Sequence, residues 1–211
     1  MATFSNFTNR LPDPNWGISE AGDGHATSFT EGPGFASVKF SSQQPVAYSR
    51  TNSGRVTTRA IAGQYWSIGI TYNPMTRDQF EPIYNFLLEK RGRLKPFYVV
   101  LPQYASPRTT TSGTLSVQGT ITSGDTNFLI DGMDSITGGL RPGDMFNFVD
   151  SGNSNHHKIY KIVRVADSNN KLSSDTALNT SDERRLYVVP PVEKDVTDNS
   201  TLDYGSPLFR V

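Results

Sequence analysis

Hydrophobic and polar residues alternate with a period of two over several short runs in the first part of the chain. These runs lie at residues 35–40, 44–50, 55–61 and 65–72. Successive side chains of a strand point to opposite faces, so short alternating runs separated by Gly, Asn and Ser turns predict antiparallel strands. We expect the strands to follow one another as a meander, with a hairpin turn at residues 52–54.

A helical period replaces this alternation after residue 75. Apolar side chains recur at i, i+3, i+4, i+7 and i+8, which forms one stripe along a helix, at Phe80, Ile83, Tyr84, Leu87 and Leu88. A sheet needs an element that covers its apolar face, so we expect the stripe to be core.

The ends of this helix have recognisable signals. Thr76 and Gln79 fit a capping box, and Gly92 suits a left-handed stop. Pro82 would remove a backbone hydrogen bond deep inside a helix that began at Thr76. We therefore predict a helix over about residues 78–91.

Strand-like runs resume after the helix. They lie at residues 97–101, 128–133, 143–149, 158–165 and 184–190, with residues 204–211 as a further candidate. Residues 108–124 are dominated by Thr, Ser and Gly and are typical of a hinge or a long weak hairpin. The turn at residues 140–144 feeds a strand, as in small barrels, so a second β-barrel-like unit is predicted.

Residues 1–34 are dense in Gly and Pro and poor in apolar residues. Such a segment is typical of an extended arm that becomes ordered on another surface, often that of a neighbouring subunit. The domains predicted are this arm, a first β domain at residues 35–107 and a second at 108–211. In one alternative the last strand returns to the first domain.

Composition excludes several classes of protein. Lys+Arg and Asp+Glu number 20 each, and this balance argues against a protein that coats nucleic acid, although it allows a local basic patch. The absence of Cys excludes disulfides and Cys-based metal or redox sites. No secretory signal and no run of apolar residues long enough to cross a bilayer is visible, so we expect no membrane partner.

Catalytic signals are weak throughout the chain. The acidic residues fall mostly in turns, where Asp is common for local hydrogen-bonding reasons, and no nucleophile elbow or phosphate-binding loop occurs. His156 and His157 are adjacent and would face opposite sides of a strand, so we expect a solvated loop there and no metal site. We predict no enzyme activity and no cofactor.

The candidate functional residues are basic and aromatic. Basic side chains could form salt bridges to acidic residues of an adjacent subunit, although helix-end charge compensation and solvated strand faces explain them equally simply. Tyr is enriched at interfaces but is also an ordinary strand residue. The predicted subunit-interface residues are Arg50, Arg55, Arg59, Arg91, Arg93, Lys95, Tyr48 and Tyr65.

Two phrases resemble a known family. The first is FLLEKRGRLKPFYVVLPQYASPR at residues 86–108, and the second is GLRPGDMF at residues 139–146, followed by a strand at 158–165 and another ending in Pro190. In order and spacing they are similar to the distal tail protein and related minor tail proteins of tailed bacteriophages. The resemblance covers about residues 35–211. The arm matches nothing in that family, and residues 167–185 are more polar than it predicts.

The resemblance implies a mainly β fold, with a tail-tube-like β-sandwich carrying one packed helix and an outward barrel-like unit. It implies a virion protein, assembled in the host cytoplasm, that forms a hexameric ring at the tail tip or baseplate. Its partners would be other copies of itself, the tail tube protein, a baseplate hub or tip protein, and tail fibres, without sequence-specific nucleic acid. The alternatives are a peripheral adaptor, a host-carbohydrate-binding module and, as a weaker rival, a tail-associated cell-wall hydrolase.

Overall fold

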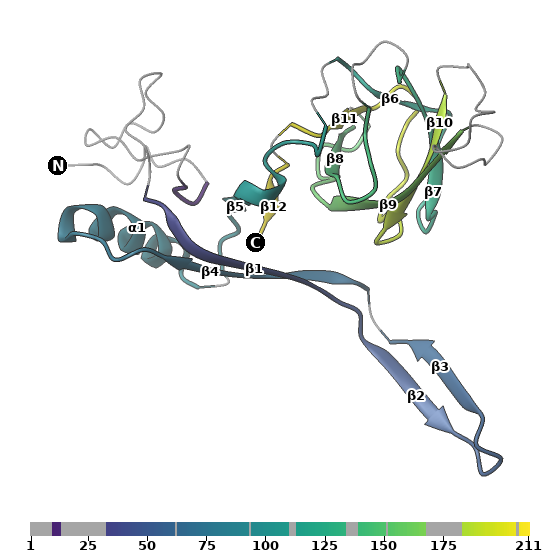
Figure 1. The fold of residues 1–211 in the computed structure, drawn as a ribbon, viewed down its shortest axis with the longest axis horizontal. Coiled ribbons are helices and arrows are strands. Elements are labelled where there is room, and N and C mark those ends of the chain that lie inside the picture. The colour runs from purple at the N-terminus through teal and green to yellow at the C-terminus, as the bar shows by residue number, and fades with distance from the viewer. Residues whose placement is uncertain are drawn as a thin grey trace. The chain divides into compact units, whose positions relative to one another are not determined.

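A computed structural model describes residues 10–13, 33–61, 63–92, 94–109, 113–133, 139–150, 152–167, 183–205 and 207–211. The described residues form β-strands and one α-helix, which confirms the predicted mainly β fold class (Figure 1). The chain divides into two compact units. Unit 1 comprises Met1–Thr8 and Pro12–Glu89, and unit 2 comprises Asn9–Leu11 and Lys90–Val211.

Unit 1 contains a hairpin nested inside a longer two-stranded ribbon. Strand β1 (Phe35–Gln43) pairs antiparallel with β4 (Tyr65–Tyr72), and β2 (Val46–Arg50) pairs antiparallel with β3 (Val56–Ala60). The predicted meander is therefore wrong, because β1 pairs with β4 and not with β2. The predicted turn is present, and pairing propagates outward from it on both sides.

The turn of the hairpin is closed by backbone bonds. The N–H of Thr51 donates to the carbonyl of Arg55 at 2.9 Å, and the N–H of Gly54 donates to the carbonyl of Thr51 at 2.9 Å. Gly54 has φ of 84°, a conformation that glycine adopts without steric cost. A turn of this kind fixes the register of the strands that flank it.

Helix α1 (Arg77–Lys90) follows β4 and begins close to the predicted position. The N–H of Thr76 donates to Oε1 of Gln79 at 3.2 Å, which is one half of the expected capping box. Pro82 lies inside the helix, so the deletion of one backbone bond is tolerated there. The helix ends in two left-handed residues, Arg91 with φ of 52° and Gly92 with φ of 66°.

Unit 2 contains a closed barrel with the strand order β10-β7-β6-β11-β8-β9. Its strands are β6 (Ser116–Gln118), β7 (Asn127–Asp131), β8 (Met145–Val149), β9 (Ile159–Asp167), β10 (Arg184–Val189) and β11 (Thr201–Asp203). The sequence analysis missed β6 and β11, because three residues are too few to show an alternation. β6 also lies within the stretch that was predicted as a hinge or weak hairpin.

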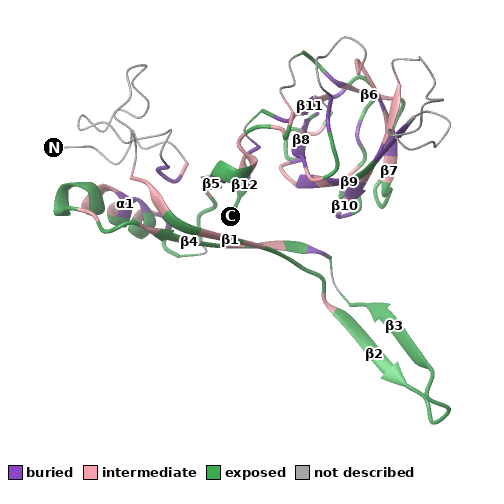
Figure 2. Ribbon diagram, in the orientation of Figure 1, coloured by how far each residue is buried: buried purple, intermediate pink, exposed green. Residues whose placement is uncertain are grey.

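The barrel interior is rich in aromatic rings, and Figure 2 shows buried residues concentrated on its strands. Phe146, Phe148 and Tyr160 pack with ring centroids 5.3–5.9 Å apart. Edge-to-face and tilted geometries of this kind add to the burial energy of the rings. The barrel therefore has its own hydrophobic core.

A small two-stranded sheet is formed by one strand before the barrel in the chain and one strand after it. Strand β5 (Tyr98–Val99) pairs with β12 (Phe209–Arg210), and the N–H of Leu11 donates to the carbonyl of Tyr98 at 2.8 Å. The strand predicted at residues 97–101 is thus shorter than expected. It leads into a 3-10 turn at Pro102–Tyr104.

Candidate assembly surfaces

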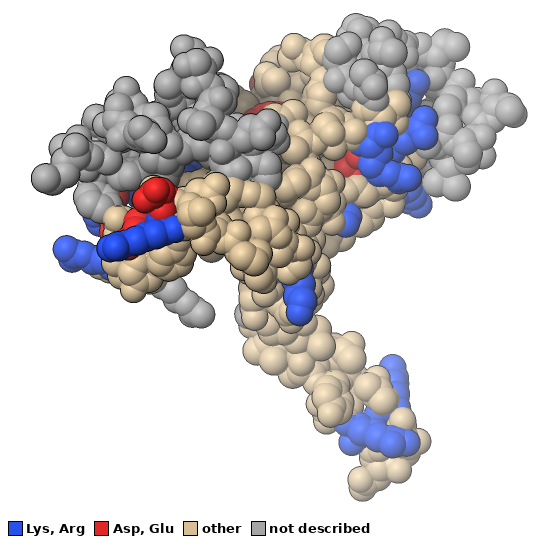
Figure 3. All heavy atoms as spheres, turned by 60° about the vertical axis from the view of Figure 1, so that its left-hand side comes forward, with Lys and Arg blue, Asp and Glu red and all other residues tan. Residues whose placement is uncertain are grey.

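The β2–β3 hairpin is exposed along its whole length. Every residue of both strands is classed as exposed, with Tyr48 at 79% and Val56 at 57%. Arg50, Arg55 and Arg59 are exposed as well, and Figure 3 shows Lys and Arg side chains gathered on this part of the molecule. The packing of unit 1 leaves these side chains accessible to another molecule.

The two faces of the hairpin differ in chemistry. Residues that are directly opposite in an antiparallel pair share one face. One face, here called the hairpin face, consists of the pairs Val46↔Ala60, Tyr48↔Thr58 and Arg50↔Val56. The opposite face consists of Ala47↔Arg59 and Ser49↔Thr57. The hairpin face therefore carries the large apolar and aromatic side chains beside Arg50, while the other side carries Arg59 among small residues.

Helix α1 carries a second exposed apolar surface. Phe80, Tyr84, Leu87 and Leu88, here called the helix stripe, are exposed at 45%, 46%, 41% and 55%. The expectation that this stripe is core is wrong for these four residues. A different stripe is buried, at Ile83, Phe86 and Lys90, which recur at i, i+3 and i+7 on the neighbouring side of the helix.

The other predicted interface residues are dispersed. Tyr65 begins β4 and is 53% exposed, opposite Gln43 in the ribbon. Arg91 and Lys95 are exposed and belong to unit 2. Arg93 lies outside the described residues. Of the predicted set, the structure brings Tyr48, Arg50, Arg55 and Arg59 together on one hairpin.

The sequence analysis missed the exposed apolar surface of α1. The sequence did contain a sign of this surface, because the apolar residues of the helix are too many to fit in a single stripe. The buried Phe86 was not included in the predicted stripe, and it is the residue that sets which side of α1 faces inward, at 0% exposure. A helix with two adjacent apolar stripes can cover a sheet with one and present the other.

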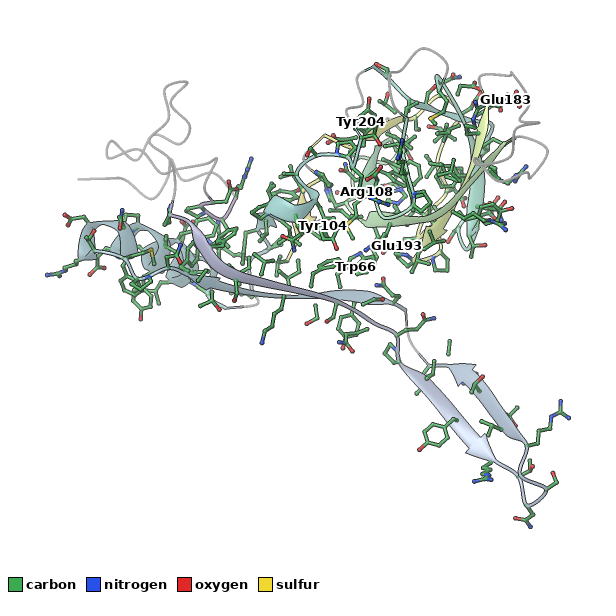
Figure 4. The ribbon with its side chains drawn as sticks, in the orientation of Figure 1. Trp66, Tyr104, Arg108, Glu183, Glu193 and Tyr204 are labelled. Atoms are coloured by element: carbon green, nitrogen blue, oxygen red, sulfur yellow. The ribbon has the colours of Figure 1, made fainter. Side chains whose placement is uncertain are left out.

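The barrel holds a buried polar cluster around Tyr160. Its hydroxyl lies 2.6 Å from Nε2 of His156 and accepts the N–H of Glu193 at 2.9 Å (Glu193 is labelled in Figure 4). The hydroxyl proton is then available to Nε2, which accepts it in the neutral tautomer that carries its proton on Nδ1. Burial lowers the pKa of His156 and raises the pKa of Tyr160. Both groups are therefore held neutral.

This arrangement corrects the expectation of a solvated histidine loop. His156 is 4% exposed, and its ring also contacts Phe148 at a centroid distance of 5.3 Å. His157 is separate from it and lies edge-on to Tyr98, 6.0 Å between centroids. His156 is buried because its ring packs against the aromatic side chains of Phe148 in β8 and Tyr160 in β9. The dipeptide His156-His157 alone does not indicate these contacts.

A second buried group joins the barrel to the segment before it. Asp144 is 3% exposed and accepts two backbone N–H groups, that of Arg108 at 2.8 Å and that of Arg141 at 2.7 Å. Arg108 also donates from Nη1 to the carbonyl of Pro142 at 2.7 Å (Figure 4). Arg108 ends the phrase at residues 86–108, and Asp144 and Pro142 belong to the phrase at residues 139–146. The two phrases are therefore joined by hydrogen bonds.

Within the part of the chain that the structure describes, no group of three or more His, Cys, Asp or Glu residues is arranged to hold a metal ion. No helix among those residues has both the length and the apolar character needed to span a bilayer.

The two exposed apolar surfaces are the kind of feature through which proteins contact other proteins. They place the chain in the class of proteins that associate with other protein surfaces. Residues 23–104 match the family model described as distal tail protein pb9, A domain, N-terminal. Distal tail protein pb9 of Escherichia phage T5 is 30% identical over 163 residues, which cover 76% of this chain and 71% of that protein. The chain therefore belongs to the distal tail protein family, and it is a structural protein of a phage tail.

Proposed function

We propose that the chain forms a ring at the tail tip or baseplate, and that this ring connects the tail tube to tip proteins or fibres. The observation that carries the proposal is that unit 1 exposes two different apolar surfaces, the hairpin face and the helix stripe. When two different surfaces of one protein bind each other between copies, the contact is head-to-tail and closes into a ring if the rotation allows. The family resemblance favours six copies.

In this proposal the three parts of the chain have different tasks. Residues 35–107 supply the ring contacts, with Tyr48, Tyr65 and the basic residues at subunit boundaries. Residues 108–211 offer an outer surface on which other tail proteins dock. Residues 1–34 cross to a neighbouring copy. The chain assembles in the host cytoplasm and remains in the virion, and its role is geometric, without catalysis.

Light scattering of the purified protein tests the ring. We expect a particle of about six times the 23.3 kDa of one chain. Removal of residues 1–34 should shift the particle toward smaller species if the arm bridges copies. A monomer at all concentrations would count against a self-assembling ring and favour a peripheral adaptor or a glycan-binding module, which glycan screening would separate.

A further inference from the structure

The hairpin and α1 lie at opposite ends of the β1–β4 ribbon (Figure 1). The hairpin connects the end of β1 at Gln43 to the start of β4 at Tyr65, while α1 follows the other end of β4 after Tyr72. The 8 residues of β4 rise about 3.3 Å each and span roughly 25 Å. The hairpin of one chain therefore does not reach the helix of the same chain, and contact between them requires a second molecule.

The two surfaces match in size. Exposed fractions of 41–55% leave on the order of 300 Å² uncovered on the helix stripe, taking about 150–250 Å² for each large side chain. Val46, Tyr48 and Val56, exposed at 52%, 79% and 57%, leave on the order of 300 Å² on the hairpin face by the same measure. A standard interface buries about 800 Å² per partner, rather more than half of it apolar. Each surface thus supplies most of an interface core.

Their charges are complementary and set a direction. Residues 35–76 contain no Asp or Glu, and the hairpin carries Arg50, Arg55 and Arg59. The first turns of α1 carry Asp78 and Glu81, the latter 3.3 Å from Arg77. The last turn of the helix carries Glu89 and the buried Lys90, and the exposed Arg91 follows it. The tip of the hairpin, where Arg50 and Arg55 lie, therefore suits the first turns of α1 better than the end that Arg91 follows.

We propose that the hairpin face of one copy packs against the helix stripe of a second copy, with the hairpin tip toward the first turn of α1. Tyr48 is the central anchor on one side, and Tyr84 and Leu87 receive it on the other. The opposite face of the hairpin, with Ser49, stays outside the contact. This inference rests on the proposed ring and names the contact that would close it, since every copy uses its hairpin on one side and its helix on the other.

Site-directed cross-linking tests the contact directly, because the chain contains no Cys of its own. Thr58→Cys, opposite Tyr48 on the hairpin face, and Leu88→Cys on the helix stripe leave Tyr48, Tyr84 and Leu87 in place. They are made as separate chains, mixed and oxidised, and the linked peptides are identified by mass spectrometry. Thr57→Cys mixed with Leu88→Cys is the matched control, because Thr57 is the neighbour of Thr58 on the opposite face. We expect at least a tenfold higher yield of the Thr58–Leu88 link than of the control link.

Light scattering on the same mixtures separates this inference from the ring proposal. A ring that shows the Thr58–Leu88 link above the control supports both. A ring in which this link is absent, or no stronger than the control, overturns the hairpin-to-helix contact and leaves the ring standing. A chain that stays monomeric and forms neither link overturns both. As a second measure, Tyr48→Ser should weaken assembly at least tenfold, while Thr57→Ser on the opposite face should leave it unchanged.

Discussion

Replacement of Tyr160 by Phe isolates the buried polar cluster of the barrel. Tyr160 is 0% exposed, and the substitution keeps its ring contacts with Phe146 and Phe148 while it removes only the hydroxyl. Two partners lose their hydrogen bond, namely Nε2 of His156 at 2.6 Å and the N–H of Glu193 at 2.9 Å. The perturbation is therefore a loss of hydrogen bonding without a change of packing.

The expected loss of unfolding free energy depends on whether each partner can replace its lost hydrogen bond with one to water. A buried polar group left without a partner costs about 1–3 kcal/mol. His156 is buried at 4% exposure and cannot recover its bond from solvent, whereas residue Glu193 is exposed. We therefore expect the free energy of unfolding of the barrel to fall by about 2–3 kcal/mol, near the top of the range for one group with a small addition from the other.

Urea unfolding at pH 7.5, followed by circular dichroism, measures this difference. Tyr84→Phe on the exposed helix stripe is the control and should change the unfolding free energy by less than about 0.5 kcal/mol. If Tyr160→Phe is as mild as the control, the cluster does not stabilise the barrel and the reasoning from its hydrogen bonds is refuted.

Three further predictions concern unit 2. Burial lowers the folded-state pKa of His156 below its ordinary value. The contribution of neutral His156 to the unfolding free energy is therefore present above about pH 6.5 and is lost as pH falls, by up to about 1.4 kcal/mol per pH unit. Unfolding of the native chain and of His156→Gln at pH 7.5 and 5.0 should show a smaller pH effect in the variant. Gly132→Ala should destabilise the barrel more than Gly124→Ala, because both have positive φ, near 96° and 97°, but only at Gly132 would the new Cβ lie 2.6 Å from the carbonyl oxygen of Thr114; equal melting temperatures would contradict this. Asp144→Ala should cost about 2–4 kcal/mol because two backbone N–H groups lose their acceptor, and urea unfolding should show partial rescue by Asp144→Asn, which keeps one of the two oxygens.

Local signals in the sequence were sufficient where structure is decided locally. The hairpin turn at residues 52–54 and the capping pair Thr76 and Gln79 involve residues within a few positions of each other. The turn forms as predicted, and one of the two expected hydrogen bonds of the capping pair is present. The strand predicted from the long alternating run at residues 158–165 is also confirmed, as β9, because a 9-residue strand repeats its pattern several times. Strands of 3 residues, such as β6 and β11, repeat nothing, and they exist only because the barrel pairs them on both sides.

Non-local decisions were not visible in the sequence. His156 is buried because Phe148 and Tyr160 approach it from two strands, and nothing in the dipeptide His156-His157 indicates which ring will be enclosed. The pairing of β1 with β4 instead of β2 is equally a choice between strands of similar pattern. In both cases the energy that decides comes from residues distant in sequence, so a pattern within one window cannot specify it.

The helix stripe shows why an assembly surface is the hardest feature to predict from one sequence. An apolar stripe has the same spacing whether the surface that covers it belongs to its own sheet or to a second copy, because the hydrophobic effect depends only on area removed from water. In α1 the structure distinguishes the two cases. Phe86 is 0% exposed, whereas Leu88, only two positions away, is 55% exposed. The two stripes of one helix then differ in what covers them: one is buried by the fold of the chain, and the other is exposed and is, in our proposal, covered by a second copy.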